Sequence, residues 1–137
     1  MSGRKVALVT GYPTSFLAVR VLDKILREEA SWEVRLVVQP RHLERARAEL
    51  AAMPAAERER VRVLEGDAAA MDLGLSGAEF VELAREVHFI HHCAAITYLG
   101  ATKAAAEQLN VGGTREGLEL AQEADPLERL LHWSTAL

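Results

Sequence analysis

A glycine turn near the start of the chain is the first place where residue types and spacing could do chemistry. The stretch 6–22, VALVTGYPTSFLAVRVL, has the pattern of a buried strand that passes through Gly11 into a helix. The first N–H groups of such a helix can hold a phosphate, because they lack helical partners and the helix dipole favours an anion. The turn therefore predicts a phosphate site, and an ordinary strand-turn-helix without a ligand is the alternative.

The turn carries fewer glycines than phosphate-binding turns between a strand and a helix usually have. The spacing G-x-x-G-x-x-G would need glycines where this sequence has Thr14 and Leu17. A loop one residue longer puts Ser15 and Ala18 in the places of the second and third glycines. Ala18 is small enough for close packing of the helix on the strand, and Ser15 could cap the helix and offer its hydroxyl to phosphate.

The histidines and the one cysteine have simpler, structural explanations. His88 and His92 would share one face of a strand while His91 points to the other, and only Cys93 adjoins them. We therefore predict no metal site. Cys93 has no neighbouring base or cation that the sequence identifies, which predicts a buried, inert thiol.

Length, charge and hydropathy restrict the class of protein. The 137 residues, 50% of them hydrophobic, are expected to form one domain with its own core, residues 1–137. The 16 basic and 20 acidic residues are mixed along the chain, and the net charge of -4 gives no footprint for nucleic acid or an anionic membrane. The chain has no signal-peptide pattern and no apolar run near the roughly 20 residues of a membrane helix, so we expect a cytoplasmic location.

Strand and helix patterns alternate along the chain. Strands are predicted at 5–10, 33–38, 61–66, 87–95 and within 127–137. Helices are predicted at 16–29, at 41–60 with a split at Pro54, at 76–87 with a capping box of Ser76 and Glu79, and at 101–124 with an interruption at Gly112 and Gly113. Such alternation predicts an α/β protein with a doubly wound parallel sheet, whose ligands bind at the carboxyl ends of the strands.

Four further motifs follow the glycine turn. Asp67 in EGD comes just after the third predicted strand, and Ala94 and Ala95 in HHCAA come after the fourth. Asn110 lies in LNVGGTREGLELA, and Thr135 lies in LLHWSTA at the end of the fifth predicted strand. Together with the glycine turn, these motifs resemble the extended short-chain dehydrogenase/reductase superfamily in type, order and approximate spacing.

Within that superfamily the sequence is most similar to the thioester-reductase and fatty-acyl-CoA-reductase group. The stretch LEGDAAAMDLGLSGAEFVELAREVHFIHHCAAITYLG follows the pattern of this group. The similarity covers the whole chain but only the first half of such an enzyme. It implies a Rossmann-like sheet with strand order 3-2-1-4-5, truncated after the fifth strand, and an NAD(P) cofactor. The residues that the resemblance places at the cofactor are Gly11, Tyr12, Pro13, Thr14, Ser15, Phe16, Leu17, Gln39, Arg41, Asp67, Ala68, Cys93, Ala94, Ala95 and Ser134.

The end of the second predicted strand bears on the choice between NAD and NADP. An acidic residue about 20 positions after the glycine turn would bind the adenosine ribose of NAD, and the segment 37–42, VVQPRH, has none. Arg41 would suit a 2′-phosphate, so NADP is favoured over NAD. Members of the resembled group often have Arg where Gln39 stands, so Arg41 must substitute for it. The alternative is that Arg41 begins a solvated helix face.

Hydride transfer to a carbonyl needs a proton donor, a group that lowers the pKa of that donor, and a polar group that holds the oxygen. By resemblance, Asn110 and Thr135 match two of the catalytic residues of the family. The family's Tyr-x-x-x-Lys pair is not matched, because Lys103 follows Tyr98 by five positions rather than three or four. The pair is expected beyond this sequence.

The sequence therefore predicts the nucleotide-binding half of an NADP-dependent reductase of an acyl thioester or aldehyde, inactive by itself. One alternative is a non-catalytic NAD(P)-binding regulatory module. Another is part of a sugar-nucleotide epimerase or dehydratase, which shares the motifs. An unpaired edge on the fifth strand also predicts self-association, or instability, of the isolated fragment.

Overall fold

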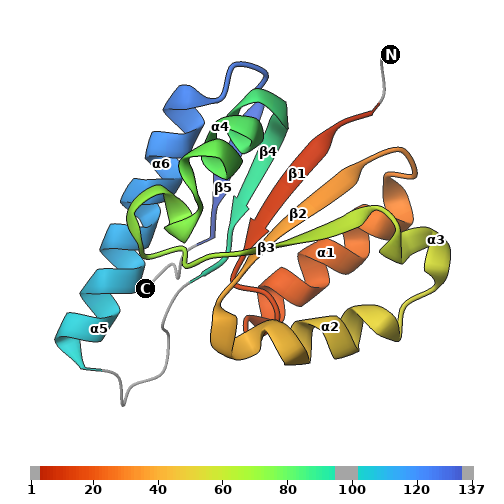
Figure 1. The fold of residues 1–137 in the computed structure, drawn as a ribbon, viewed down its shortest axis with the longest axis horizontal. Coiled ribbons are helices and arrows are strands. Elements are labelled where there is room, and N and C mark those ends of the chain that lie inside the picture. The colour runs from red at the N-terminus through yellow and green to blue at the C-terminus, as the bar shows by residue number, and fades with distance from the viewer. Residues whose placement is uncertain (1–3, 95–101, 134–137) are drawn as a thin grey trace.

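A single parallel sheet positions the elements of the chain. The structure is a computed structural model that describes residues 4–94 and 102–133. Its strands run parallel in the order β3-β2-β1-β4-β5 (Figure 1), which confirms the predicted doubly wound order. The strands are β1 (Val6–Thr10), β2 (Glu33–Val38), β3 (Val61–Glu65), β4 (Val87–His92) and β5 (Arg129–His132).

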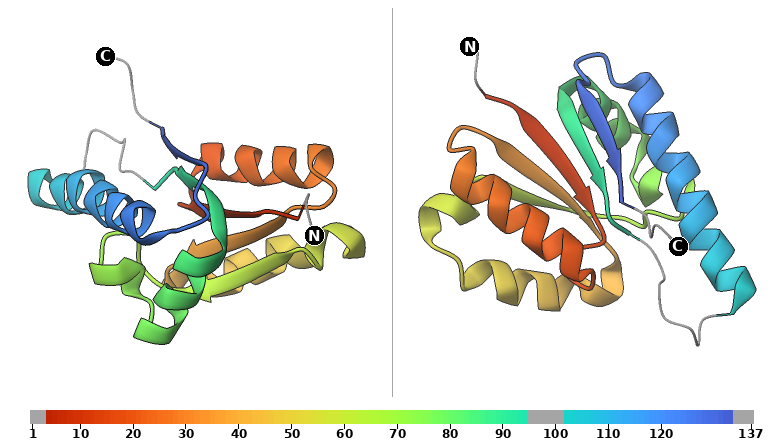
Figure 2. Two further views of the ribbon diagram at one scale, coloured as in Figure 1. Left: turned by 90° about the horizontal axis from the view of Figure 1, so that it is seen from above. Right: turned by 180° about the vertical axis from the view of Figure 1, so that it is seen from behind.

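Helices cover both faces of this sheet (Figure 2). One face carries α1 (Phe16–Glu28) and α2 (Leu43–Ala51), and the other carries α4 (Gly77–Glu86) and α6 (Gly113–Glu123). None of the helices in the described ranges is long and apolar enough to span a membrane. The shorter helical segments are η1 (Pro40–His42), α3 (Ala55–Arg58), η2 (Met71–Gly74), α5 (Lys103–Glu107) and the π-helical η3 (Gln108–Gly112).

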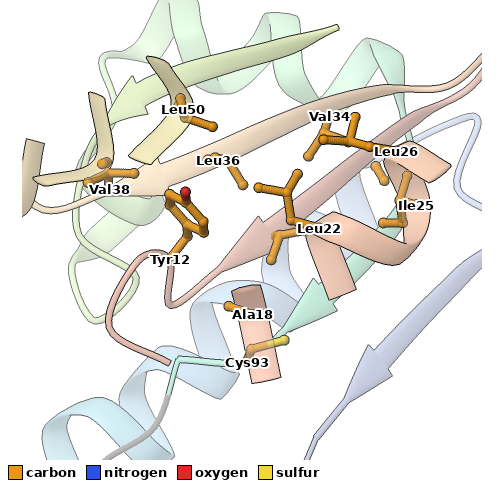
Figure 3. Close-up of a cluster of buried hydrophobic side chains, with 13 residues drawn as sticks. Tyr12, Ala18, Leu22, Ile25, Leu26, Val34, Leu36, Val38, Leu50 and Cys93 are labelled. Carbon is orange, nitrogen blue, oxygen red and sulfur yellow. The ribbon is translucent and has the colours of Figure 1, made fainter. Parts of the chain in front are cut away.

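Side-chain alternation along the strands divides the core between the two faces. In β1, Ala7 and Val9 belong to the cluster under α1 and α2, whereas Leu8 belongs to the cluster under α4 and α6. Leu22 of α1 and Leu120 of α6 are fully buried in these two clusters. Figure 3 shows the first cluster, in which side chains of β2, α1 and α2 pack together. Burial on both faces explains why the strands read as continuous apolar runs.

Local signals set the ends of the helices. Ser15 and Ser76 are the N-caps of α1 and α4, and Ser76 forms the predicted capping box with Glu79. Pro54 separates α2 from α3, as predicted. The interruption predicted inside 101–124 is a π-helical turn that joins α5 to α6 rather than a break between two helices.

β5 forms one edge of the sheet. It contains 4 residues, Arg129–His132, and the continuation predicted over 134–137 lies outside the described residues. Its inner edge pairs with β4, and no strand of the described ranges pairs with its outer edge. The N–H and C=O groups of that outer edge are therefore available for pairing with a strand of another chain.

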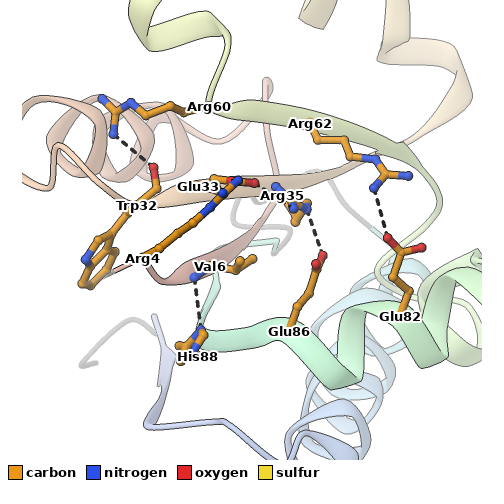
Figure 4. Close-up of polar contacts among 10 residues, drawn as sticks. All are labelled: Arg4, Val6, Trp32, Glu33, Arg35, Arg60, Arg62, Glu82, Glu86 and His88. Carbon is orange, nitrogen blue, oxygen red and sulfur yellow. Dashed lines mark hydrogen bonds and ion pairs between the residues drawn. The ribbon is translucent and has the colours of Figure 1, made fainter. Parts of the chain in front are cut away.

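A buried ion-pair network joins β2 to the end of α4 (Figure 4). Arg35 is only 8% exposed, and its guanidinium donates to the carboxylates of Glu33 and Glu86, at 3.0 Å in each case. In the register of the sheet, Arg35 lies beside Arg62 of β3, whose 3.3 Å pair with Glu82 is exposed. The two arginines therefore differ in burial although they occupy matched positions on neighbouring strands.

We predict that Arg35→Ala lowers the free energy of unfolding by about 3 kcal/mol, because the partly buried carboxylate of Glu86 loses its cation and that of Glu33 keeps only its pair with the exposed Arg4. Arg62→Ala should lower it by less than about 1 kcal/mol, since an exposed ion pair contributes little. Chemical denaturation of both variants and the wild type measures these values. Equal losses in the two variants would contradict the role given to the buried network.

Candidate nucleotide-binding site

Residues that the sequence predicts for the cofactor gather at the carboxyl edge of the sheet. The glycine turn follows β1, Gln39 follows β2, Asp67 closely follows β3, and Cys93 follows β4. β1 lies between β2 and β4, where the order of the strands reverses. Doubly wound sheets bind their ligands at such a switch point. The structure thus brings four separate segments of the sequence to one edge.

Gly11 brings the turn into close contact with the end of β4. Its φ of 94° lies in the left-handed region, which favours glycine. A Cβ at this position would lie 3.0 Å from the carbonyl carbon of Cys93 and 3.0 Å from the backbone nitrogen of Ala94. The turn can therefore approach the backbone after β4 only because residue 11 has no side chain.

The hydroxyl of Thr10 ties the ends of β1 and β4 together. Its Oγ1 accepts hydrogen bonds from the backbone N–H groups of Cys93 and Ala94 at 3.1 and 3.2 Å, and it lies 3.0 Å from Nδ1 of His92. Because N–H donors occupy both lone pairs of the hydroxyl, we assign its proton to the bond with Nδ1. His92 is then neutral and carries its own proton on Nε2.

His92 packs between β1, β5 and α6. Burial, and to a smaller extent the nearby His132, lowers the pKa of His92 to about 4. Its ring is only 3% exposed and is stacked on the ring of His132. A Cβ at Gly113 or Gly117 would lie 3.6 or 3.9 Å from the His92 ring, so the ring fills the space that these two glycines leave. The sequence did not predict this role, because only the register that pairs His92 with Thr10 distinguishes it from the neighbouring histidines.

The other polar groups of β4 and its end have structural roles. Cys93 is buried, as predicted, and burial raises the pKa of its thiol to about 12, which keeps it protonated near neutral pH. Nδ1 of His88 accepts a hydrogen bond from the backbone N–H of Val6 at 3.1 Å. In the part of the chain that the structure describes, no group of three or more His, Cys, Asp or Glu side chains is arranged to hold a metal ion.

The first turn of α1 presents backbone donors beside the glycine turn. Oγ of Ser15 accepts the N–H of Ala18 at 3.2 Å, which confirms the predicted cap. The backbone N–H of Ser15 donates to the carbonyl of Gly11 at 2.8 Å and closes the lengthened loop. The N–H groups of Phe16 and Leu17 lie too early in the helix to find helical acceptors. The arrangement therefore fits an anion in spite of the missing glycines.

Tyr12 supports the turn from inside the core. Tyr12 is 3% exposed, and burial, followed by the charge of Glu49 of α2, raises the pKa of Tyr12 to about 12. The peptide bond between Tyr12 and Pro13 is cis. A groove of about 500 Å³ separates the turn from α2, and it is lined partly by Arg45, which the sequence analysis did not single out. Arg45 lies four residues after Arg41 in the helix predicted over 41–60, so the sequence could have placed the two arginines on the same face.

A chain of polar side chains connects the ends of β2 and β3. Nε of Arg41 donates to Oε1 of Gln39 at 3.0 Å, and Nε2 of Gln39 donates to Oδ1 of Asp67 at 3.4 Å. The same oxygen of Asp67 accepts the backbone N–H of Ala69 at 2.9 Å. Ala68 is buried next to Asp67. The structure thus groups four of the predicted cofactor residues at this side of the sheet.

The loop after β3 folds back on its own start in a conformation that the sequence analysis did not predict. Asp72 and Leu73 have φ values of 53° and 59°, and Gly74 has 68°, so three successive residues are left-handed. The backbone N–H of Asp67 donates to the carbonyl of Leu73 at 2.8 Å. A Cβ on Gly66 would overlap that carbonyl oxygen. The two glycines in EGDAAAMDLG were the only local signal for this fold.

Asn110, a predicted catalytic residue, lies in the π-helical η3 between α5 and α6. The hydroxyl of Thr114 donates to the carbonyl oxygen of Asn110 at 2.7 Å, where the regular pattern of helical bonds changes. Single π-helical turns inside helices are frequent at functional sites. The predicted site residues Ala95, Ser134 and Thr135 lie outside the described residues, so their positions relative to Asn110 stay predictions.

Solved structures share this arrangement. The terminal R domain from the myxalamid PKS-NRPS biosynthetic pathway matches with a TM-score of 0.82 and 27% identity, over 96% of this chain and 34% of that one. The reductase domain of a nonribosomal peptide synthetase from Mycobacterium tuberculosis matches with a TM-score of 0.73 and 25% identity, over 96% of this chain and 33% of that one. The class is therefore the extended short-chain dehydrogenases/reductases of thioester-reductase type, which confirms the resemblance found in the motifs.

Sequence comparison gives the family. Residues 9–137 match the model of an NAD-binding family described as Male sterility protein, and the chain belongs to this family. Human fatty acyl-CoA reductase 2 is 29% identical over 147 aligned residues, which cover 98% of this chain and 28% of the relative. The chain thus spans between 28% and 34% of the length of these three relatives. Membership of this NAD-binding family supports a nicotinamide dinucleotide as the cofactor of the domain.

We predict that acid destabilises the fold through His92. Its pKa is about 4 in the folded chain against 6.5 for an unperturbed histidine, so below about pH 6.5 the unfolded chain binds a proton that the folded chain does not. From about pH 7.5 to about pH 5 the free energy of unfolding should fall by about 2 kcal/mol more in the wild type than in His92→Asn. Urea denaturation at both pH values measures the difference. The same pH dependence in both chains would assign it to other groups.

Proposed function

We propose that residues 1–137 hold NADP for a reductase that acts on an acyl thioester or on the aldehyde derived from it. The observation that carries the choice of NADP is the polar chain from Arg41 through Gln39 to Asp67. The substrate class is supported by the names of the relatives, a fatty acyl-CoA reductase and a peptide synthetase reductase domain. These names favour a reductase over the sugar-nucleotide epimerase or dehydratase alternative.

The end of β2 favours a 2′-phosphate over a free ribose hydroxyl. A site for NAD places an Asp or Glu there, whereas this chain has Gln39 and then Arg41. The bond to Gln39 uses Nε of Arg41, which is an exposed residue. In the proposed complex the terminal amino groups of the guanidinium would bind the 2′-phosphate. A guanidinium binds a phosphate through two parallel hydrogen bonds to two charged oxygens. A neutral ribose hydroxyl has no such pair of oxygens.

With the 2′-phosphate at Arg41, the other parts of the cofactor would meet the remaining predicted residues. The pyrophosphate would bind the N–H groups of Phe16 and Leu17 in the first turn of α1. The adenine would meet Asp67 and Ala68, next to Gln39. The nicotinamide end would lie toward β4 and the segment after β5, near Cys93, Ala94, Ala95 and Ser134.

Asn110 and Thr135 are the residues of this chain that we assign to catalysis. The bound nicotinamide supplies the hydride. An amide and a hydroxyl can hold the carbonyl oxygen of a substrate, but neither is an acid that gives up a proton readily near neutral pH. The Tyr-x-x-x-Lys pair that would do so does not occur in residues 1–137. These residues alone are therefore expected to bind cofactor without turnover.

We predict that Arg41→Ala weakens NADPH binding about tenfold or more but changes NADH binding less than about twofold, because only NADPH carries the 2′-phosphate. Arg47→Ala removes the same charge from an exposed position on α2 and serves as the control. Titration followed by nicotinamide fluorescence gives the dissociation constants. Equal losses for both cofactors would contradict the choice of NADP. A wild type that binds neither cofactor would favour a non-catalytic module with a degraded site.

We also propose that the outer edge of β5 pairs with a second copy of the chain. The support is the row of backbone groups there that no strand of the described ranges covers. Sedimentation velocity of residues 1–137 over a range of concentrations should show a dimer that grows with concentration. A monomer with a cooperative thermal melt at every concentration would contradict this proposal.

A further inference from the structure

Glu116 joins α6 to the loop that follows β3. Its Oε1 accepts a hydrogen bond from the backbone N–H of Asp72 at 3.1 Å. The loop and the helix pack against each other although 44 residues separate the two bonded groups (Figures 1 and 2). We propose that Glu116 is a positioning residue for the adenine end of the cofactor, a role that rests on the dinucleotide binding proposed above.

The bonded residue lies in the least favourable stretch of the loop backbone. Asp72 and Leu73 have φ values of 53° and 59°, which residues with a side chain rarely adopt. Such a conformation persists only where the surroundings enforce it. Two contacts do so here: the side chain of Leu73 is 1% exposed in the core under α6, and Glu116 holds the N–H of Asp72.

The left-handed stretch in turn fixes the backbone of Asp67. The carbonyl of Leu73 accepts the N–H of Asp67 at 2.8 Å, and the carbonyl of Asp67 accepts the N–H of Ala70 at 2.9 Å. The carboxylate of Asp67 then bonds to Gln39 at 3.4 Å. A shift of Asp72 would therefore move its neighbour Leu73, whose carbonyl holds the N–H of Asp67. A shift of Asp67 would in turn move its bond to Gln39 at the end of β2, where the adenosine is proposed to bind.

The helix provides a closely packed support for this loop. Gly113 lies three residues before Glu116 on the same side of α6, and a Cβ there would lie 3.2 Å from the carbonyl oxygen of Ala68. Gly117, the residue after Glu116, faces the ring of His92. One side of α6, formed by Gly113, Glu116 and Gly117, therefore contacts the loop that follows β3. It also contacts His92, which bonds to Thr10 at the ends of β4 and β1.

The test compares Glu116→Gln with Glu116→Met, since the two side chains have similar shape and only glutamine can accept the N–H of Asp72. Glu119→Met, on the exposed side of α6, is the control. Calorimetric titration with NADPH and with adenosine 2′,5′-bisphosphate should show about tenfold weaker binding of both ligands to the Glu116→Met variant and wild-type binding to the other two variants. In Glu116→Met, hydrogen exchange should become faster at the amides of Asp67 and Asp72 and stay unchanged at Cys93.

Each other outcome decides against the proposal. Wild-type affinity in Glu116→Met would overturn the positioning role and leave the proposed function intact. Equal losses in Glu116→Gln and Glu116→Met would show that acceptance of the Asp72 N–H is not the cause. Faster exchange at Cys93 as well, or loss of a cooperative melt, would assign Glu116 to the stability of the whole fold. A wild type that binds neither ligand would overturn the proposed function and, with it, this role.

Discussion

The hydroxyl of Thr10 is the contact on which the arrangement of the site depends. β1 and β4 are neighbours in the sheet, but the chain between them passes through two other strands and both layers of helices. The hydroxyl fixes how their ends meet, because it accepts two consecutive backbone N–H groups at the end of β4. Gly11 then lets the turn lie against that same backbone. Together these two residues put the first turn of α1 and the backbone of Cys93 and Ala94 on one edge, which is the geometry that a dinucleotide needs.

The same contact reaches α6 through His92. Nδ1 of the histidine accepts a hydrogen bond from the hydroxyl of Thr10, and the ring fills the space beside two glycines of the helix, so the glycine turn, the end of β4 and α6 pack as one unit. Low solvent exposure keeps this histidine neutral, with a pKa of about 4, and so keeps its Nδ1 able to accept. Asn110 lies in the π-helical turn that leads into the same helix, and Glu116 attaches the loop after β3 to it. α6 therefore supports both the proposed catalytic side and the proposed adenine side of the site.

The sequence predicted those parts of the molecule whose signals are local. Apolar runs predicted the strands, and Ser15, Ser76 and Pro54 predicted helix boundaries. The order of the strands came from the resemblance to the superfamily, and the structure confirms it. Contacts between distant residues were not predicted, because 82 residues separate Thr10 from His92 and the sequence alone does not show their register. The left-handed backbone of Asp72 was missed for a related reason: tertiary bonds enforce a conformation that its residue type does not favour.

The first turn of α1 is the part of the molecule most directly open to test, because Ser15 and Ala18 stand there in place of glycines. Titration of the 15N-labelled chain with NADPH, followed by NMR, reports on each backbone amide separately. The amides of Phe16 and Leu17 should shift together with that of Gln39 and give a single dissociation constant, while the exposed Val81 on α4 should not shift. Saturating NADPH that leaves the amides of Phe16 and Leu17 unmoved would contradict dinucleotide binding at this turn.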